Sequence, residues 1–168
     1  MNKCNNNVTD SGTSAARYVF LFALCFLLFG FFSAILVGDP ISYSELDSPP
    51  LSPPPQLFAI VWSVLYIIVG GVTGAVFANN IKELNEERRF GLTLSFLGFI
   101  LNLLWYPLFF GRGELTAALV DVAVILIFNI VCTVGFYKIK KAYGLLLVPY
   151  SLWLAFAFYL NLGYIILN

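Results

Sequence analysis

Five long runs of apolar residues divide this sequence, and they restrict its fold more than any other feature. They cover about residues 18–37, 55–79, 90–110, 115–136 and 144–167. Each is about 20 residues or longer, and at about 1.5 Å of rise per residue a helix of that length crosses a hydrocarbon core of about 30 Å. A membrane β-barrel would show short segments of alternating hydrophobicity, whereas these runs are apolar on every face. The sequence therefore predicts an all-α membrane protein, a bundle of five transmembrane helices.

The N-terminal segment "MNKCNNNVTDSGTSAA" differs from the rest of the chain because it is polar and low in complexity. Such a segment cannot bury enough apolar surface to fold, so residues 1–16 are predicted to form a disordered tail. The first apolar run is long for the core of a signal peptide, and no A-x-A cleavage site follows it. Residues 17–168 are therefore expected to form one transmembrane domain of five retained helices.

Composition excludes several classes of function. Only 11% of the residues are charged and 60% are hydrophobic, whereas about a quarter of the residues in soluble proteins are charged. The net charge is zero and there is no histidine, so we expect no nucleic-acid partner and no histidine-based metal or acid–base site. The three cysteines are widely spaced, which argues against a disulfide framework or a CxxC metal site. We expect membrane lipid as a partner, no metal, and no required cofactor.

Basic residues are distributed unequally between the two ends of the expected bundle. Eight of the nine fall in the N-terminal region, in the connection before residue 90, or in the connection before residue 144, and Arg112 is the exception. By the positive-inside rule, the N-terminus and these two connections face the inside, and the C-terminus faces the outside. The rule does not distinguish a bacterial from a mitochondrial-type membrane, and mitochondrial import follows different cues, so both membranes stay open.

The connection over residues 38–54 lies on the opposite side and contains the proline-rich stretch "SPPLSPP". Proline fixes the φ angle and lacks an N–H donor, so such a segment is stiff and suits the first turn of the helix that follows. The connection is either a simple linker with a helix-start signal or a shaped cover over the end of the bundle.

Four of the expected helices place tryptophan or polar side chains in one layer of the membrane. By residue count this layer is roughly 8 to 12 Å below the outer boundary, and it contains Trp62, Asn102, Trp105, Asp121 and Asn161. Polar groups are costly in hydrocarbon unless they face the bundle interior or a cavity. The alternative is that the amides and the carboxylate only join helices by hydrogen bonds. We expect the Asp121 carboxylate to form interhelical hydrogen bonds with Asn102 or Asn161. Its main role would then be to stabilise the bundle, not to contact a ligand.

Four motifs, in register, resemble the TspO/MBR family, also called the translocator protein or peripheral benzodiazepine receptor family. They are Pro53-Pro54 followed by "VWSVLY", then "LNLLWYPLFFG", "ALVD" and "PYSLWLAFAFYLN". The resemblance runs from about Tyr43 to the C-terminus. It implies a five-helix bundle, commonly a homodimer, whose pocket beneath the first long loop binds porphyrins such as protoporphyrin IX and, in some members, cholesterol. It also implies that the loop over residues 38–54 is the lid of the pocket.

The resemblance assigns ligand-binding roles to Pro53, Pro54, Trp62, Tyr66, Asn102, Trp105, Asp121, Trp153, Phe156, Ala157, Leu160 and Asn161. It implies binding between the second and fifth helices, with stacking on Trp62 and Trp153. The chain departs from the family pattern at Leu51 and Gln56, where the family usually has aromatic residues. It also ends in "GYIILN", without the basic residue of the cholesterol motif.

The favoured function is a membrane receptor or regulator of tetrapyrrole handling. A tetrapyrrole is flat and aromatic, so it requires apolar walls, indole faces and a few polar groups. The lack of histidine favours free porphyrin over coordinated haem. One alternative is light-driven porphyrin degradation assisted by Trp62 and Trp153. This enzymatic role depends on the resemblance alone, because no acid–base pair, activated nucleophile or metal site is visible. The second alternative is a transporter of porphyrin or sterol. The absence of visible inverted repeats in the sequence disfavours this alternative.

Small residues on two of the expected helices allow close helix packing. Gly70 and Gly74 form a GxxxG pattern that we assign to packing inside the protomer. Gly91, Ser95 and Gly98 are predicted to form a homodimer interface on the third helix.

Overall fold

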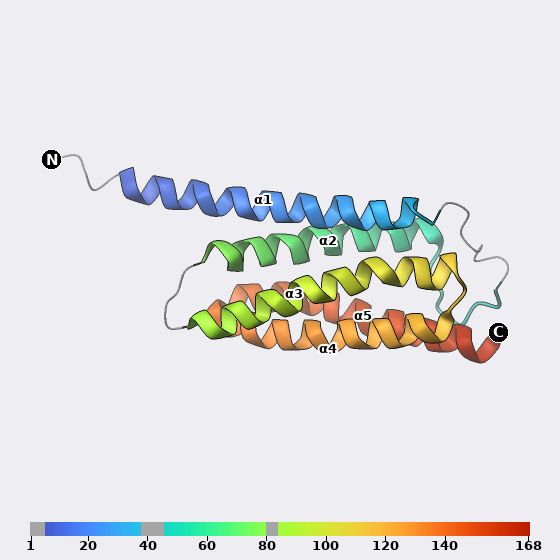
Figure 1. Ribbon diagram of the computed structural model, residues 1–168. Coiled ribbons are helices and arrows are strands. Elements are labelled where there is room, and N and C mark those ends of the chain that lie inside the picture. The colour runs from blue at the N-terminus through green and yellow to red at the C-terminus, as the bar shows by residue number, and fades with distance from the viewer. Residues whose placement is uncertain (1–5, 38–45, 80–83) are drawn as a thin grey trace.

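Five long helices run back and forth side by side in the computed structural model, which describes residues 6–37, 46–79 and 84–168 (Figure 1). These residues contain no β-strand, and all five helices are long and apolar enough to cross a membrane, with mean hydropathies of 1.7 to 2.5. The predicted all-α bundle of five helices is thus confirmed. The elements are α1 (Asn6–Ile35), α2 (Pro55–Ala78), α3 (Asn85–Tyr106), the π-helical turn η3 (Pro107–Gly111), α4 (Leu115–Ile139) and α5 (Lys141–Leu167).

The helices form a closed ring in the order α1, α2, α5, α4 and α3. The most extensive contacts join α1 to α2, α4 to α5 and α3 to α4, and smaller contacts join α2 to α5 and α1 to α3. Apolar side chains such as Val76, Phe136 and Leu154 are fully buried between the helices. Helix α1 is the most peripheral, since 11% of its apolar window is buried within the protein against 33 to 39% for the other four.

Four helices are longer than the apolar runs predicted, and the largest difference is in α1. This helix begins at Asn6, within the segment 1–16 that was expected to be a disordered tail, and residues 1–5 lie outside the described part of the chain. An apolar run marks the portion of a helix that lies in hydrocarbon. Once a helix is nucleated, each further residue adds a hydrogen bond at little cost, so the helix continues through polar residues beyond the run.

The same extension shortens the connections on one side of the bundle. Helix α3 begins at Asn85 instead of residue 90, and α4 ends at Ile139 instead of residue 136. Because α5 begins at Lys141, Lys140 alone separates it from α4.

Glycines on α2 allow its backbone to lie directly against that of α1. A Cβ atom on Gly70 would lie 2.6 Å from the carbonyl oxygen of Phe22, and one on Gly74 would overlap the carbonyl oxygen of Tyr18. Side chains of any size at these two positions would therefore separate the helices. The prediction that these glycines serve packing inside the protomer is confirmed.

The small residues of α3 also face the interior of the protomer. Gly91 packs against Phe136, and Ser95 shares a hydrogen bond of 2.7 Å with Thr73. Gly98 is buried beside the Phe128 side chain of α4. These three residues are therefore engaged in packing within one chain, and dimerisation through the third helix is not tested by this single chain. Homodimer formation itself remains a prediction.

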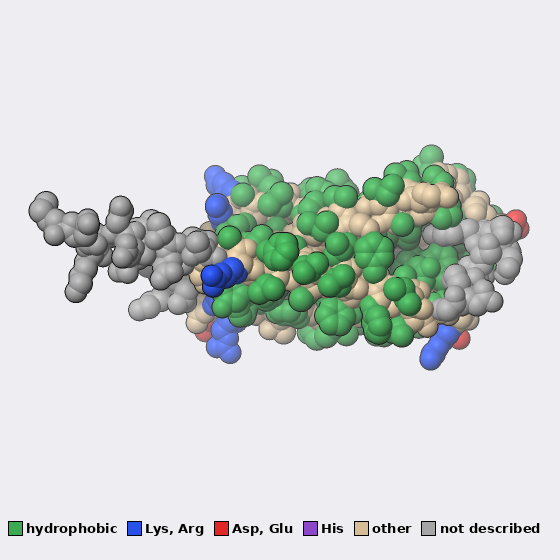
Figure 2. Space-filling view, turned by 90° about the horizontal axis from the view of Figure 1, so that it is seen from above, with side chains coloured by type: hydrophobic (Ala, Val, Ile, Leu, Met, Phe, Trp, Pro, Cys, Tyr) green, Lys and Arg blue, Asp and Glu red, His purple; other side chains and the backbone are tan. Residues whose placement is uncertain are grey.

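The two ends of the bundle differ in charge. Seen from the α1 side, a broad apolar belt separates a cluster of Lys and Arg at one end from a smaller charged group at the other (Figure 2). We call the first the basic end, formed around Arg88 and Lys140, and the second the proline end, formed by residues 46–54 and 112–114. At the basic end Arg88 donates hydrogen bonds to the carbonyl oxygens of Val76 and Phe77. A cation here satisfies carbonyl groups that the C-terminus of α2 leaves unpaired.

The contact between α1 and α2 predicts that two glycines of α2 respond oppositely to the same substitution. Gly74→Ala should lower the free energy of unfolding by about 1 to 3 kcal/mol, because the new methyl group overlaps the α1 backbone. Gly71→Ala is the matched control, since its Cβ would meet only Val19 at an ordinary 3.7 Å. Alanine favours a helix over glycine by about 1 kcal/mol, so this variant should melt at or above the wild-type temperature. Thermal unfolding in detergent measures the stability of both variants. Equal losses of stability in the two would contradict the backbone contact assigned to Gly74.

Candidate functional site

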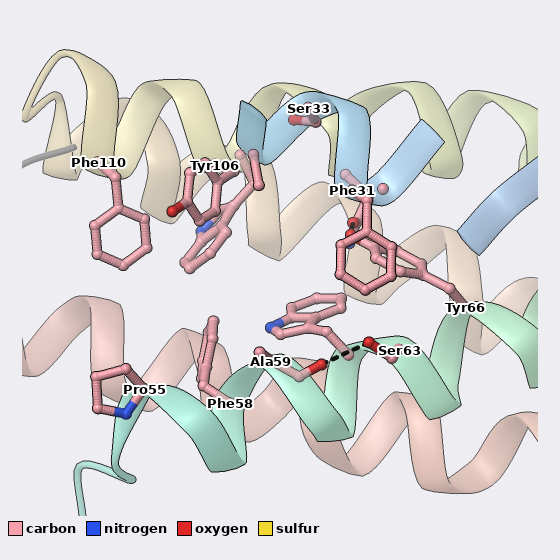
Figure 3. A pocket seen from close by; sticks show the side chains of 14 residues that line it. Phe31, Ser33, Pro55, Phe58, Ala59, Ser63, Tyr66, Tyr106 and Phe110 are labelled. Atoms are coloured by element: carbon pink, nitrogen blue, oxygen red, sulfur yellow. Dashed lines mark hydrogen bonds between the residues drawn. The ribbon is translucent and has the colours of Figure 1, made fainter. Parts of the chain in front are cut away.

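A cavity of about 400 Å³ lies at the proline end, between α1, α2 and α3 (Figure 3). Three of its lining residues, Phe31, Pro55 and Ala59, are exposed, so the cavity opens to the surface between α1 and the start of α2. It is lined by Gly30, Phe31, Ser33, Ala34, Pro55, Phe58, Ala59, Trp62, Ser63, Tyr66, Asn102, Trp105, Tyr106 and Phe110.

Helix α2 supplies one continuous face of this cavity. Its lining residues begin at Pro55 and recur at intervals of three and four positions up to Tyr66, which places them on the same side of a helix. On the opposite wall, the Tyr66 ring lies directly against Gly30 of α1. The ring occupies the space that a Cβ atom on residue 30 would need. The glycine therefore allows the large ring to sit between the two helices.

Aromatic rings form most of the wall and continue behind it. The Trp62 ring centroid lies 5.5 Å from that of Tyr66 and 6.1 Å from that of Trp105. Phe58 is 6.0 Å from Trp62 in an edge-on arrangement, and Trp153 of α5 contacts Trp62 edge-on at 6.4 Å. Such offset and edge-on contacts are the favourable geometries for aromatic pairs. The cluster connects α2, α3 and α5 through apolar surface.

Hydrogen bonds fix the polar side chains at the inner end of the cavity. Tyr66 donates to the Asn102 side-chain oxygen over 2.5 Å, and the Asn102 amide donates to the Tyr150 hydroxyl over 3.1 Å. In α1, the Ser33 hydroxyl donates to the Leu103 carbonyl oxygen. The buried indole N–H of Trp62, by contrast, has no hydrogen-bond partner among the described residues. Trp62 therefore contributes its ring to the cavity wall and carries a buried donor without a partner among the described residues.

The residues predicted on α5 do not line this cavity. Ala157, Leu160 and Asn161 border a separate space of about 10 Å³, together with Phe58 and Trp105. Asn161 joins three helices, because it accepts a hydrogen bond from the Trp105 indole and donates to the Leu115 carbonyl oxygen.

Trp153 packs on Phe58 at 5.7 Å and on Phe156 at 5.4 Å, behind the α2 wall. The expected pocket between α2 and α5 is therefore a packed contact, and the open cavity lies on the α1 side of α2. Of the predicted residues, Trp62, Tyr66, Asn102 and Trp105 line the cavity, while Trp153, Phe156, Ala157, Leu160 and Asn161 do not.

Asp121 is buried on α4 and borders neither of these two spaces. The predicted bonds to Asn102 or Asn161 are not formed, because both amides are engaged elsewhere. Its Oδ2 atom is buried without a hydrogen-bond partner in the described part of the chain. The prediction that interhelical amides hold this carboxylate is wrong.

The described part of the proline-rich connection is attached to α5. The Asp47 N–H donates to the Asn168 side chain, which in turn donates to the Asp47 carbonyl oxygen, at 2.9 and 3.1 Å. Tyr159 donates to the Pro50 carbonyl oxygen over 3.0 Å, and Pro49 is buried against Gly163. This segment thus covers the end of α5.

Pro53 and Pro54, which were predicted as ligand contacts, lead into α2 and do not line the cavity, whereas Pro55 does. The rest of the predicted lid, residues 38–45, lies outside the described residues.

A turn within this segment holds Leu51 in a left-handed conformation, with φ 68°. The Ser52 N–H closes the turn on the Pro49 carbonyl oxygen at 3.3 Å. A residue with a Cβ atom pays about 1 to 2 kcal/mol for this conformation. Leu51 is also 80% exposed, so its side chain gains little from packing.

Sequence reasoning missed the α1 wall and several residues of α2. The spacing of three and four residues around Trp62 would have selected Phe58 and Ala59, and Ser63 follows four residues after Ala59. On α1, Gly30, Ser33 and Ala34 are small residues at helical spacing in an otherwise bulky apolar helix, which is a weaker signal.

The arrangement defines an integral multi-pass membrane protein, a five-helix bundle with an aromatic-lined cavity between α1, α2 and α3. The model of the TspO/MBR family matches residues 21–167 of this chain, and the chain belongs to that family. It is 34% identical over 157 residues to the tryptophan-rich protein TspO of Chlorobaculum tepidum, which covers 90% of this chain and 98% of the relative. It is 33% identical over 122 residues to the translocator protein of Bos taurus, covering 71% and 70% of the two chains. It is also 30% identical over 128 residues to the tryptophan-rich sensory protein of Cereibacter sphaeroides, covering 75% and 76%.

The position of Asp121 gives a prediction about stability and binding. Replacing it by alanine removes a buried carboxylate oxygen that has no hydrogen-bond partner among the described residues, so the desolvation cost disappears along with the side chain. We expect the melting temperature of Asp121→Ala in detergent to equal or exceed that of wild type, with ligand affinity unchanged. Asn161→Ala is the contrasting variant, because it breaks two interhelical hydrogen bonds and should cost about 1 to 3 kcal/mol. A lower melting temperature and weaker binding in Asp121→Ala would show that the carboxylate has a stabilising role.

Proposed function

We propose that this protein is a membrane receptor or regulator that binds a flat aromatic ligand of the tetrapyrrole class, with protoporphyrin IX as the model compound. One observation carries the proposal: a cavity of about 400 Å³ has mostly aromatic walls and one buried indole N–H that lacks a partner among the described residues. Its volume falls in the range of about 300 to 1,000 Å³ that is typical of ligand sites.

The chemistry of a free porphyrin matches these walls. Its macrocycle offers a large apolar face for offset stacking on Trp62 and Trp105. The Trp62 N–H is buried without a described partner, so a ligand carbonyl or carboxylate can accept from it only after the indole reorients, and such a bond would remove the cost of the unpaired donor. The propionate groups would remain at the open side of the cavity, near Phe31, Pro55 and Ala59, where charged groups keep their contact with water or lipid headgroups. A sterol would fill the apolar space but lacks the faces for stacking.

The names of two relatives, translocator protein and tryptophan-rich sensory protein, are consistent with recognition or movement of a small molecule. The close contact between Trp62 and Trp153 also allows photochemistry of a bound porphyrin to be examined in the same experiment.

Two tryptophans provide a matched test of the binding proposal. Titration with protoporphyrin IX should quench tryptophan fluorescence saturably. Trp62→Phe removes part of the stacking surface and the unpaired donor, so affinity should fall by about 0.5 to 1.5 kcal/mol for each lost stacking contact. Trp153→Phe is the control, because this side chain lies behind the wall and its replacement should leave affinity close to that of wild type.

Three outcomes separate the possible functions. The absence of saturable binding to the wild-type protein would exclude the proposal, and equal affinities in wild type and Trp62→Phe would exclude the assigned wall. A new chromophore formed under light, lost in Trp62→Phe and Trp153→Phe, would show an enzymatic role. Movement of labelled porphyrin across a vesicle membrane would show transport.

The charge difference between the two ends also supports an orientation, in which the basic end faces the inside. In a variant without native cysteines, a cysteine can replace the exposed Glu86 at the basic end or the exposed Glu114 at the proline end. We expect a membrane-impermeant maleimide to label Glu114→Cys in intact cells and Glu86→Cys only after permeabilisation. The reverse labelling pattern would show the opposite orientation.

A further inference from the structure

Two side chains separate the large cavity from the small space on α5. Phe58 and Trp105 line both the cavity of about 400 Å³ and the space of about 10 Å³ bordered by Ala157, Leu160 and Asn161. Their ring centroids are 5.9 Å apart, so together they form the wall between the two spaces.

The two wall residues are held in different ways. Trp105 donates its indole N–H to Asn161 over 3.1 Å and stacks on Phe109 at 5.2 Å. Moving Trp105 would therefore break an interhelical hydrogen bond. The Phe58 side chain has no hydrogen-bonding group, and its ring meets Trp62, Trp105 and Trp153 at centroid distances of 5.7 to 6.0 Å. Shortening Phe58 thus removes ring contacts and no side-chain hydrogen bond, since phenylalanine has no hydrogen-bonding group in its side chain.

We infer that Phe58 is the residue that limits ligand size in this cavity. With the ring in place, a ligand contacts α1, α2 and α3 and stops short of α5. With the ring displaced or shortened, the cavity extends to Ala157 and Asn161, and a macrocycle gains room. This inference rests on the proposed function for its ligand class, but the wall that it describes can be tested without any ligand.

The first test compares a large and a small flat carboxylate, protoporphyrin IX and 1-pyrenebutyrate. Because pocket length discriminates strongly between ligands of different size, Phe58→Ala should raise the ratio of porphyrin affinity to pyrenebutyrate affinity about tenfold, and Phe58→Trp should lower it by a similar factor. Phe58→Leu, which preserves more of the packing, should give an intermediate ratio and shows that the effect does not come from misfolding. Phe26→Ala is the matched control, since Phe26 is an equally buried ring that does not line the cavity, and its ratio should equal that of wild type. Equal ratios in all Phe58 variants would overturn the inference.

The second test uses no ligand. In a variant without native cysteines, Ala157→Cys places a thiol on the α5 side of the wall, where Ala157 is 2% exposed. N-ethylmaleimide should label this thiol slowly when residue 58 is phenylalanine and about tenfold faster when it is alanine, because removing a buried ring opens a cavity. Equal rates would show that Phe58 does not close the cavity. If the wild-type protein does not bind porphyrin but the labelling rates with phenylalanine and alanine at residue 58 still differ, the proposed function is wrong. The conclusion that Phe58 separates the two spaces then remains valid.

Discussion

The backbone contact between α1 and α2 determines where this protein can have an open site. In a membrane, helices gain little from burying apolar surface against one another, so close packing through small residues provides much of their association. Gly70 and Gly74 bring α2 onto the carbonyl groups of α1 near the basic end. Toward the proline end the large rings of Trp62 and Tyr66 replace these glycines on the same face of α2, and the cavity occupies the space beside them. The backbone contact at the glycines and the cavity are therefore two parts of one interface between α1 and α2.

Two asparagines hold the aromatic walls in fixed positions. Asn102 connects α2 and α5 through two tyrosine hydroxyls, and Asn161 connects α3 and α4 through an indole and a backbone carbonyl. A side-chain amide suits this task because it both donates and accepts, and each bond made inside hydrocarbon avoids the cost of an unpaired polar group. With both amides occupied, the Trp62 N–H remains as a donor in the wall without a described partner. The side chains that fix the helices are thus different from the indole that lacks a described partner.

The number of helices could be predicted because hydrocarbon thickness sets the length of an apolar run, and Trp62 and Asn102 could be placed in the site because their depth coincides. Trp153 and Ala157 were expected in the cavity from the family resemblance but face packed contacts, because motifs in a sequence do not show which side chains a particular chain leaves open space beside. The α1 wall could not be foreseen because Gly30 and Ala34 carry no distinctive chemistry. Helix ends were misplaced for another reason, since hydrogen bonding continues a helix beyond the apolar run.

The uneven attachment of α1 has a mechanical consequence. The helix is fixed to α2 by backbone contact near Tyr18, while farther along Ser33 is joined to α3 by a side-chain hydrogen bond. These two points are separated by about 22 Å at about 1.5 Å per residue, so a tilt of about 5° at the glycines moves the mouth of the cavity by about 2 Å. The Ser33 hydrogen bond to α3 therefore determines the width of the opening, because it holds the α1 wall of the cavity far from the backbone contact at the glycines.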